Sequence, residues 1–306
     1  MAPATAGDPL TGLKWTRKTT AKVSQELQRN GFEVCAKTVG RLLDSLDYAL
    51  RVNHKKLSRG SAKTRSQRNR QFQYIERMRA SFAGEGAPVI SVDSKKKEPI
   101  GCFKNPGAAW TRTATAVNDH DFRSDASALA TPYGILDTGA NRGHVVVGLS
   151  HDTPAFAADA IAQWWKSEGR RRYPKAHKLL ILADSGGSNS SRCRAWKHQV
   201  QIKLADSFAL EVTVCHYPPG ASKWNPIEHR LFSYISKNWA AEPLVSLEKM
   251  LNFIRTTKTK TGLRVKAALN KRQYPTGVKP SRQDMNNLNL IPHQALPDWN
   301  YTLAPR

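Results

Sequence analysis

Residues 88–93 read PVISVD and residues 179–184 read LLILAD, two short apolar runs that each close on an aspartate. Runs of this length, rich in branched aliphatic side chains, are typical of buried strands. Similar runs at residues 133–137, 144–149 and 210–215 bring the expected strands to five. Thr153 and Pro154 have the residue types of a helix N-cap and a first helical position, and residues 191–208 read as a second helix. This pattern predicts an α/β fold in which a mixed five-stranded sheet is flanked by helices.

The aspartates that end the two runs, Asp93 and Asp184, are the first candidate functional residues. An α/β sheet binds its ligands beyond the carboxyl ends of its strands, so both carboxylates are well placed to act on a substrate. The alternative is structural, because aspartate is also common where a strand gives way to a turn.

A third candidate carboxylate, Glu228, lies in the stretch SKWNPIEHRLF at residues 222–232. Asn225 suits the N-cap of a helix and Pro226 its first position, which puts Glu228 in the first turn. The apolar positions predict a buried stripe of Ile227, Leu231, Tyr234 and Ile235. The structural alternative is a capping box, in which the glutamate reaches back to the N–H of the cap residue.

Together, the three carboxylates indicate chemistry on a phosphodiester. Two Mg²⁺ ions about 3.5 to 4 Å apart need hard oxygen ligands on both sides of a scissile phosphate. One ion would activate an attacking water or 3′-hydroxyl, and the other would stabilise the leaving oxygen. We therefore expect Asp93, Asp184 and Glu228 to be both catalytic and metal-binding, with Mg²⁺ as the cofactor and Mn²⁺ able to replace it. The sequence contains no P-loop motif that would favour a nucleotide instead.

The charge of the chain points to a polyanionic partner. Its 306 residues include 48 Lys and Arg against 24 Asp and Glu, a formal net charge of +24. This surplus favours nucleic acid over an acidic membrane, a ribosome or a merely solvated surface. No signal peptide or membrane span of about 18 apolar residues is present, so we expect a cytoplasmic, nucleoid-associated protein without a membrane partner. The four cysteines form no C-x-x-C pair and are expected to be reduced.

The N-terminal part predicts a small helix-turn-helix domain at residues 1–50, with residues 36–46 as its recognition helix. That helix has an apolar stripe at residues 39, 42, 43 and 46, and Lys37, Thr38 and Arg41 lie on its other faces as candidate DNA contacts. A helical packing unit without DNA contacts is the alternative. Residues 51–70 are rich in Lys and Arg and read as a linker. A connecting helix at 71–82 completes the segment 51–83, and residues 84–306 form the catalytic domain.

Further basic and aromatic residues are candidates for contact with DNA. Lys95, Lys96 and Lys97 follow Asp93 and could hold the backbone near the cut, although lysine is also common on solvated sheet edges. Three residues precede the NPIE motif at residues 225–228, and packing within the loop is their alternative role: His216, Lys223 and Trp224. An exposed tryptophan could stack on an unpaired base.

Seven segments of the chain are distinctive: PVISVDSKKKEPIGCFKNPG, VNDHDF, PYGILD, DTPAFAADAIAQWW, LLILADSGGSN, VTVCHYPPGASKWNPIEHRLFSYIS and PDWNYT. They resemble the DDE domain of a bacterial insertion-sequence transposase family, distantly akin to mariner-like transposases. The resemblance runs from about residue 84 to the C-terminus and is most distinctive from Cys215 to Ser236. The resemblance implies an RNase H-like fold with Asp93, Asp184 and Glu228 as the catalytic triad.

The sequence departs from the family pattern at two positions and at its start. Cys35 stands where similar proteins tend to carry a serine that caps the recognition helix, and Ser185 replaces a common glycine. Family members usually carry a further DNA-binding segment before the position of GDPLTGLKWT, so we expect an N-terminally shortened copy.

The expected function is that of a DDE transposase that cuts the ends of its element and joins the 3′-hydroxyls to target DNA. The expected partners are the terminal inverted repeats and target DNA, with assembly into a homo-oligomer on DNA. Two alternatives stay open. One is an RNase H-like nuclease or resolvase that cleaves without joining. The other is a shortened inactive copy that binds the element ends and inhibits the full-length enzyme.

Overall fold

The chain forms two compact units, Met1–Gly60 and Ser61–Arg306. The structure is a computed structural model that describes residues 5–7, 14–16, 18–50 and 65–306. Within those ranges, no helix is both long and apolar enough to cross a membrane.

The first unit contains a short strand pair and two helices. Strands β1 (Thr5–Gly7) and β2 (Lys14–Thr16) are antiparallel. Helices α1 (Thr20–Arg29) and α2 (Ala36–Ser45) follow, so the helix predicted at residues 36–46 is confirmed to within one residue. The apolar stripe of α2 is only partly buried: Val39 is buried, but Leu42 and Leu46 are exposed. Among the described helices of this unit, only α1 packs on α2. A single helix covers only part of the apolar stripe, so the rest of the stripe stays exposed.

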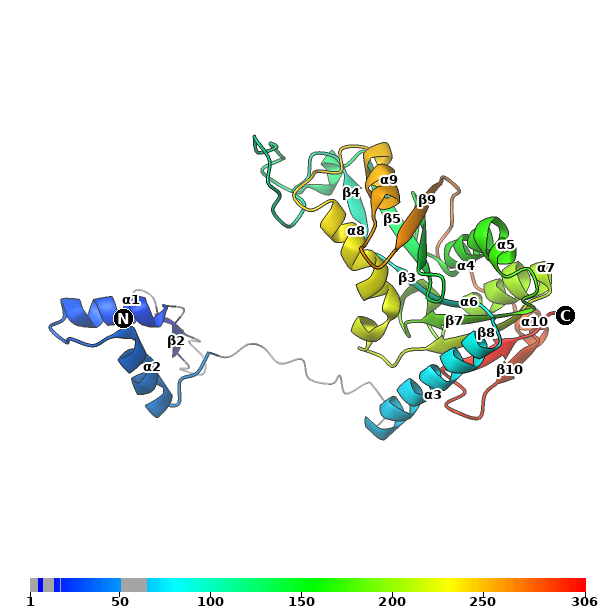
Figure 1. Cartoon of the computed structure of the whole chain (residues 1–306), viewed down its shortest axis with the longest axis horizontal. Coiled ribbons are helices and arrows are strands. Elements are labelled where there is room, and N and C mark those ends of the chain that lie inside the picture. Colours follow the sequence, from blue (N-terminus) through cyan, green and yellow to red (C-terminus); the bar gives the residue numbers. More distant parts are fainter. Residues whose placement is uncertain (1–4, 8–13, 17, 51–64) are drawn as a thin grey trace. The chain divides into compact units, whose positions relative to one another are not determined.

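The second unit is built on a mixed sheet that has nine strands in the described residues (Figure 1). The five expected strands form its centre: β3 (Val89–Ser94), β5 (Ala128–Asp137), β6 (Arg142–Gly148), β7 (Lys178–Ala183) and β8 (Glu211–His216). Strand β5 runs antiparallel to β3 and β6, whereas β3, β7 and β8 are parallel. The predicted α/β, RNase H-like architecture is therefore confirmed.

The sheet is wider than the sequence indicates, because four short or polar strands extend it. These are β4 (Glu98–Ile100), β9 (Arg264–Asn270), β10 (Leu290–Pro292) and β11 (Asn300–Leu303). Strand β9 pairs with β6, and β11 pairs with β8. Strands of three or four residues, such as β4, β10 and β11, are too short to show a clear alternating pattern, and β9 carries basic residues.

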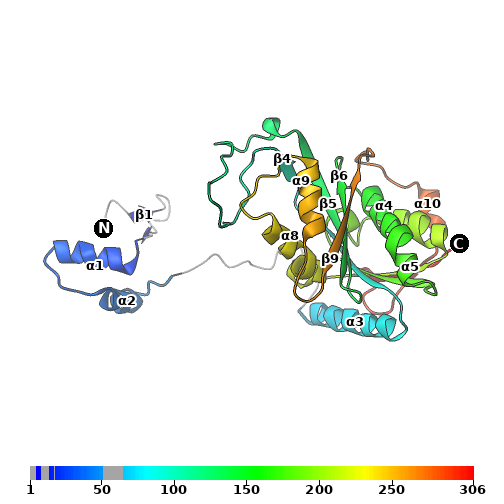
Figure 2. The same cartoon turned by 45° about the horizontal axis from the view of Figure 1, so that its top comes forward.

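Helices cover both faces of the sheet, as Figures 1 and 2 show from two directions. Helices α4 (Pro154–Trp164) and α6 (Arg194–Val200) pack on one face. Helices α3 (Arg65–Gly84), α8 (Ser233–Asn238) and α9 (Leu247–Thr256) pack on the other. The shorter helices are α5 (Arg170–Arg172), α7 (Asp206–Phe208) and α10 (Arg282–Asn286), with 3₁₀ turns η2 (Arg123–Asp125), η4 (Gly187–Asn189) and η6 (Ser222–Trp224). Three π-helical turns are η3 (Trp165–Gly169), η5 (Gln201–Ala205) and η7 (Glu228–Phe232).

Local sequence explains where several of these helices begin. Thr153 caps α4 by accepting the N–H of Phe156 at 3.3 Å, as its sequence predicts. Helix α3 begins at Arg65, within the segment that we expected to be a linker, because arginine and glutamine are good helix formers. Its buried Ile75 and Phe82 pack on the sheet. The remainder of the predicted linker, residues 51–64, lies outside the described residues.

Candidate active site

Asp93 and Asp184 lie side by side at the carboxyl ends of the neighbouring central strands β3 and β7. Strands β3 and β7 are parallel neighbours, and Val92 is paired with Ala183. The residue after each member of this pair is an aspartate, so the strand register brings the two carboxylates together. Asp93 is the penultimate residue of β3, and both side chains are half-buried.

Asn225 connects this pair of carboxylates to the helix that carries Glu228. Its amide nitrogen donates to the Asp184 carboxylate at 3.1 Å and to the carbonyl of Val92 at 3.3 Å. Its amide oxygen accepts the hydroxyl of Ser91 at 2.5 Å. The Asn225 side chain is thus engaged with the sheet, and the N–H of Glu228 bonds the Asn225 carbonyl instead, at 3.1 Å. The capping-box alternative for Glu228 is therefore wrong.

The helix of Glu228 begins with a π-helical turn that changes which residues are buried. Ile227, Leu231 and Ile235 are buried as predicted, but Tyr234 is 36% exposed and Phe232 is buried in its place. The turn η7 holds one residue more than an α-helical turn, which rotates the residues after it. Among the described residues, the Glu228 side chain has no hydrogen bond or ion pair of its own.

Close packing sets the distance of this helix from the sheet. Gly134 is paired with Asp93 across β5 and β3. A Cβ added at Gly134 would lie 2.6 Å from Cε1 of Phe232 and 2.8 Å from Cδ1 of Ile227. The absence of a side chain at residue 134 therefore lets the helix of Glu228 approach the sheet.

We expect Gly134→Ala to lower the free energy of unfolding by about 1–3 kcal/mol, because the added methyl overpacks the contact with Phe232. The displaced helix should also weaken catalysis. Urea unfolding and a DNA cleavage assay would measure the two effects. Gly139→Ala is the matched control, since its Cβ would meet atoms no closer than 3.8 Å. If the two variants are equally stable, Gly134 does not set this spacing.

The three carboxylates influence one another electrostatically. The pKa of Asp93 is raised to about 8, first by burial and then by the charges of Asp184, Glu228 and Asp152, against a hydrogen bond from the N–H of Ser94 that lowers it. Burial also raises the pKa of Asp184, as does the charge of Glu228, whereas the Asn225 amide lowers it. In the ranges that the structure describes, Asp93, Asp184 and Glu228 form no salt bridge with a basic side chain.

This electrostatic arrangement fits a divalent cation. Half-buried carboxylates that repel one another are stabilised by a cation, and carboxylate oxygens are the ligands that Mg²⁺ prefers. The side chains as they lie do not form a closed set of ligands: in the described part of the chain, no three His, Cys, Asp or Glu side chains are close enough to hold one ion.

Two residues near the carboxylates were not identified from the sequence. Asp152 lies between β6 and α4. Because β6 and β3 run in the same direction, Asp152 follows the carboxyl end of its strand on the same side of the sheet as Asp93. Its Oδ1 atom is buried without a hydrogen-bond partner in the described residues, as is the hydroxyl of Tyr133. Asn225 was recognised only as a helix cap. The sequence signal for Asp152 is its place just beyond the end of a strand.

Two of the predicted DNA contacts are occupied or buried. The ammonium group of Lys95 pairs with Glu98 and lies 4.9 Å from the ring centre of Trp239. His216 is fully buried at the end of β8, so its predicted direct contact with DNA does not fit the structure. Its ring bonds the backbone carbonyl of Asp184 at 3.0 Å, and burial lowers the pKa of His216 to about 4.

The other predicted DNA contacts are accessible. Lys96, Lys97 and Lys223 are exposed, and Trp224 is 59% exposed. The ring of Trp224 makes a T-shaped contact with Phe72, and the ammonium group of Lys223 lies 5.3 Å from its centre. The packing alternative for Trp224 thus holds only in part, because more than half of the residue remains exposed.

In the first unit, Lys37 and Arg41 are also exposed. Thr38 is half-buried, and its hydroxyl lies 3.3 Å from the sulfur of Cys35. Cys35 precedes α2 but makes no capping hydrogen bond with its side chain.

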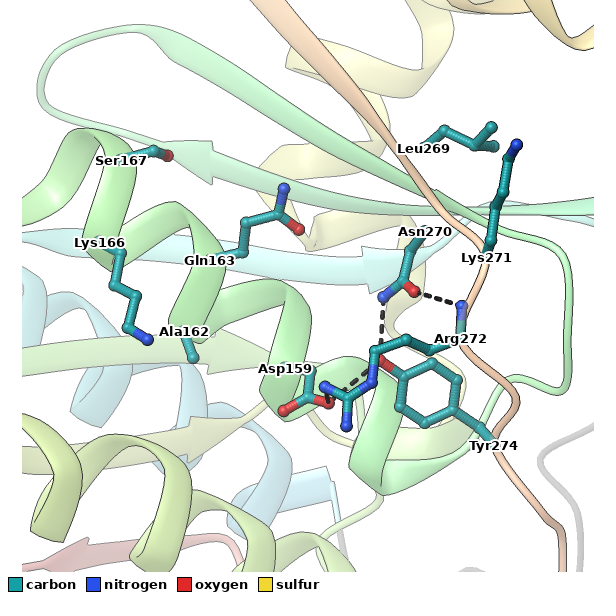
Figure 3. A pocket seen from close by; sticks show the side chains of 10 residues that line it. All are labelled: Asp159, Ala162, Gln163, Lys166, Ser167, Leu269, Asn270, Lys271, Arg272 and Tyr274. Carbon is teal, nitrogen blue, oxygen red and sulfur yellow. Dashed lines mark hydrogen bonds and ion pairs between the residues drawn. The ribbon is translucent and has the colours of Figure 1, made fainter.

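A separate hollow lies between α4 and the chain that follows β9 (Figure 3). The carboxylate of Asp159 accepts hydrogen bonds from Lys203 at 2.7 Å, Arg272 at 3.2 Å and the hydroxyl of Tyr274 at 3.0 Å. These contacts attach the chain after β9 to α4. None of the three candidate carboxylates lines this hollow, so it is not the candidate active site.

Comparison with solved structures finds chains of Mos1 transposase. The first is described as a Mos1 transposase paired-end complex with left transposon end; it has 12% identity and a TM-score of 0.46, over 78% of this chain and 65% of that one. A Mos1 mariner paired end complex with Mn has 14% identity and a TM-score of 0.43, over 78% and 65%. A Mos1 Strand Transfer Complex has 14% identity and a TM-score of 0.44, over 78% and 64%. The present chain thus spans about 65% of the length of the first of these Mos1 chains.

Comparison with curated protein sequences gives no match. Comparison with protein families matches residues 1–305 to the family described as Rhodopirellula transposase DDE domain. Because this match covers nearly the whole sequence, the chain belongs to the Rhodopirellula transposase DDE domain family.

Proposed function

We propose that this protein is a metal-dependent DDE transposase that cleaves the ends of its insertion sequence and joins the 3′-hydroxyls to target DNA. The observation that supports the proposal most strongly is the set of three carboxylates, Asp93, Asp184 and Glu228, in a chain of a transposase family. Asp93 and Asp184 are adjacent in the sheet register, Glu228 influences the pKa of both, and no basic side chain in the described residues pairs with them.

Asp93, Asp184 and Glu228 would hold the divalent cations, with Mg²⁺ as the cofactor and Mn²⁺ able to replace it. Bound ions of this kind polarise a phosphoryl oxygen and lower the pKa of a nucleophilic water or hydroxyl. The chain's own residues prepare the site. Asn225 orients the carboxylate of Asp184, and the free side chain of Glu228 is able to turn towards a cation.

The substrate would be duplex DNA, drawn by the net charge of +24. We propose that Lys37, Thr38 and Arg41 of α2 contribute to recognition of the terminal inverted repeats. In the second unit, exposed residues would contact the backbone and bases near the cut: Lys96, Lys97, Lys223 and Trp224. We further propose a homo-oligomer that pairs two ends, acting at the nucleoid in the cytoplasm.

The test is a cleavage and joining assay on DNA that carries the element ends. We expect 3′-hydroxyl ends and joined products with Mg²⁺ or Mn²⁺, and none of either when EDTA removes the metal. Cleavage without joined products would support the nuclease or resolvase alternative. Tight binding to the ends without cleavage, with inhibition of a full-length relative, would support the inhibitor alternative. Either of these outcomes contradicts the transposase proposal.

A further inference from the structure

A chain of buried hydrogen bonds ends at the backbone of Asp184. It begins at the indole N–H of Trp196 in α6, which lies 3.0 Å from the hydroxyl oxygen of Tyr301 in β11. That hydroxyl lies 3.1 Å from Nε2 of His216 in β8. The other ring nitrogen, Nδ1, lies 3.0 Å from the carbonyl oxygen of Asp184. Trp196, Tyr301 and His216 are all completely buried.

The chemistry of the two end groups decides which atom donates and which accepts in each of these three hydrogen bonds. An indole nitrogen only donates and a carbonyl oxygen only accepts. Nδ1 of His216 must therefore carry the proton that bonds Asp184. Burial disfavours a charged ring, so Nε2 is bare and accepts the hydroxyl proton of Tyr301. The hydroxyl oxygen of Tyr301 in turn accepts the Trp196 N–H, and each group has its partner.

The backbone of His216 is held as well. Its N–H donates to the carbonyl of Trp299 at 2.9 Å, and its carbonyl accepts the amide of the buried Gln71 at 2.9 Å. Asp184 has no such support from a strand, because β7 ends at Ala183. The imidazole of His216 is thus a rigid donor that holds the first residue beyond the strand.

We propose that His216 is a positioning residue for Asp184, and that Trp196 and Tyr301 set the tautomer of its ring that performs this role. The inference rests on the proposed function, in which Asp184 holds a divalent cation. By holding the main chain of Asp184, His216 limits the directions in which the carboxylate can point. Asn225 then orients the carboxylate itself from the other side. Supporting hydrogen bonds of this kind typically change metal affinity by about 10- to 100-fold when they are lost.

Two amide substitutions at residue 216, each of which replaces one of the two ring nitrogens, separate positioning from general packing. In His216→Asn the amide nitrogen is bonded to Cγ, as Nδ1 is, so the bond to Asp184 can be kept. In His216→Gln the amide lies one bond further out and can replace only the contact with Tyr301. Each variant keeps one of the two ring contacts, so their losses in stability should be similar.

The measurement is calorimetric titration of Mn²⁺ alone into the full chain, with urea unfolding measured in parallel. We expect His216→Gln to bind Mn²⁺ about 10- to 100-fold more weakly than the wild type, and His216→Asn to stay within about threefold of it. Equal Mn²⁺ affinities for the two variants would overturn the proposal, since a merely structural role lowers their stability without separating their affinities.

Tyr301→Phe keeps the inference testable if His216→Gln does not fold. This variant removes the hydroxyl that donates to Nε2. A proton on Nε2 is then no longer opposed by Tyr301, and only the bond to Asp184 still favours the tautomer with its proton on Nδ1. We expect weaker Mn²⁺ binding than in Tyr274→Phe, a control that also removes a buried tyrosine hydroxyl but whose partners lie at the hollow of Figure 3. Wild-type affinity in Tyr301→Phe would count against the hydrogen-bond chain.

The result for Asp184→Asn distinguishes a failure of the proposed function from a failure of the positioning role of His216. If the wild type binds Mn²⁺ no better than Asp184→Asn, the proposed function fails and the inference fails with it. If Asp184→Asn loses binding while the variants at 216 and 301 keep it, the metal site stands and only the positioning role is overturned.

Discussion

Glu228→Gln is expected to slow DNA cleavage and joining by two to three orders of magnitude while the fold and DNA binding remain intact. The substitution keeps the size of the side chain and removes the negative charge that a divalent cation needs. Each factor of ten in rate corresponds to about 1.4 kcal/mol, so this loss corresponds to about 3–4 kcal/mol of metal-dependent stabilisation. Rates would be measured at saturating Mg²⁺ on DNA carrying the element ends.

The matched control for this experiment is Glu248→Gln. Glu248 is also an acidic residue in the first turn of a helix, α9, but it is exposed and does not affect the pKa of Asp93 or Asp184. Asp93→Asn and Asp184→Asn should resemble Glu228→Gln, and combining them should add little, because residues that act as a unit are not additive. Near-normal cleavage by Glu228→Gln would remove Glu228 from the catalytic group.

Asn225→Asp is expected to lower the free energy of unfolding by about 3–5 kcal/mol, the range for an uncompensated buried charge. Asn225 is completely buried, and its amide nitrogen faces two groups that only accept, the carboxylate of Asp184 and the carbonyl of Val92. The substitution leaves the volume unchanged and replaces the donor with an oxygen. Urea unfolding without metal would measure the loss.

A comparison with Asn238→Asp would show whether burial is the cause. The side chain of Asn238 also donates to a carbonyl, that of Phe253 at 2.6 Å, but it is exposed. We expect its substitution to change the stability by less than about 1 kcal/mol. If both substitutions cost the same, the amide of Asn225 does not face Asp184 in the way described.

The strands and the candidate carboxylates were predictable because their signals are local. An apolar run followed by an aspartate identifies β3 and β7 from six residues each, and Thr153 with Pro154 identifies the start of α4. Strands β9, β10 and β11 were missed because β9 carries basic residues at its start, and β10 and β11 are only three and four residues long. Their place in the sheet depends on pairing with β6 and β8, which no local pattern records.

The tertiary structure decided the roles of Asn225 and His216. In the sequence, Asn225 has the residue type and place of a helix cap, and His216 stands shortly before the segment that carries Glu228. The partners that changed these interpretations lie far away in the chain: Ser91 and Asp184 for Asn225, and Tyr301 for His216. A polar side chain bonds whichever group packing brings within reach, so its role follows from contacts that the local sequence does not contain.

By itself, the sequence determined the class of fold, the basic character of the chain and the identity of Asp93, Asp184 and Glu228 as candidates, because periodicity, charge and residue type are properties of short segments. Only the tertiary structure decided that Phe232 rather than Tyr234 faces the sheet, since the π-helical turn forms where the helix packs against Gly134. It also decided that Asp93 and Asp184 are neighbours. That depends on the register of two parallel strands that lie some 90 residues apart in the sequence.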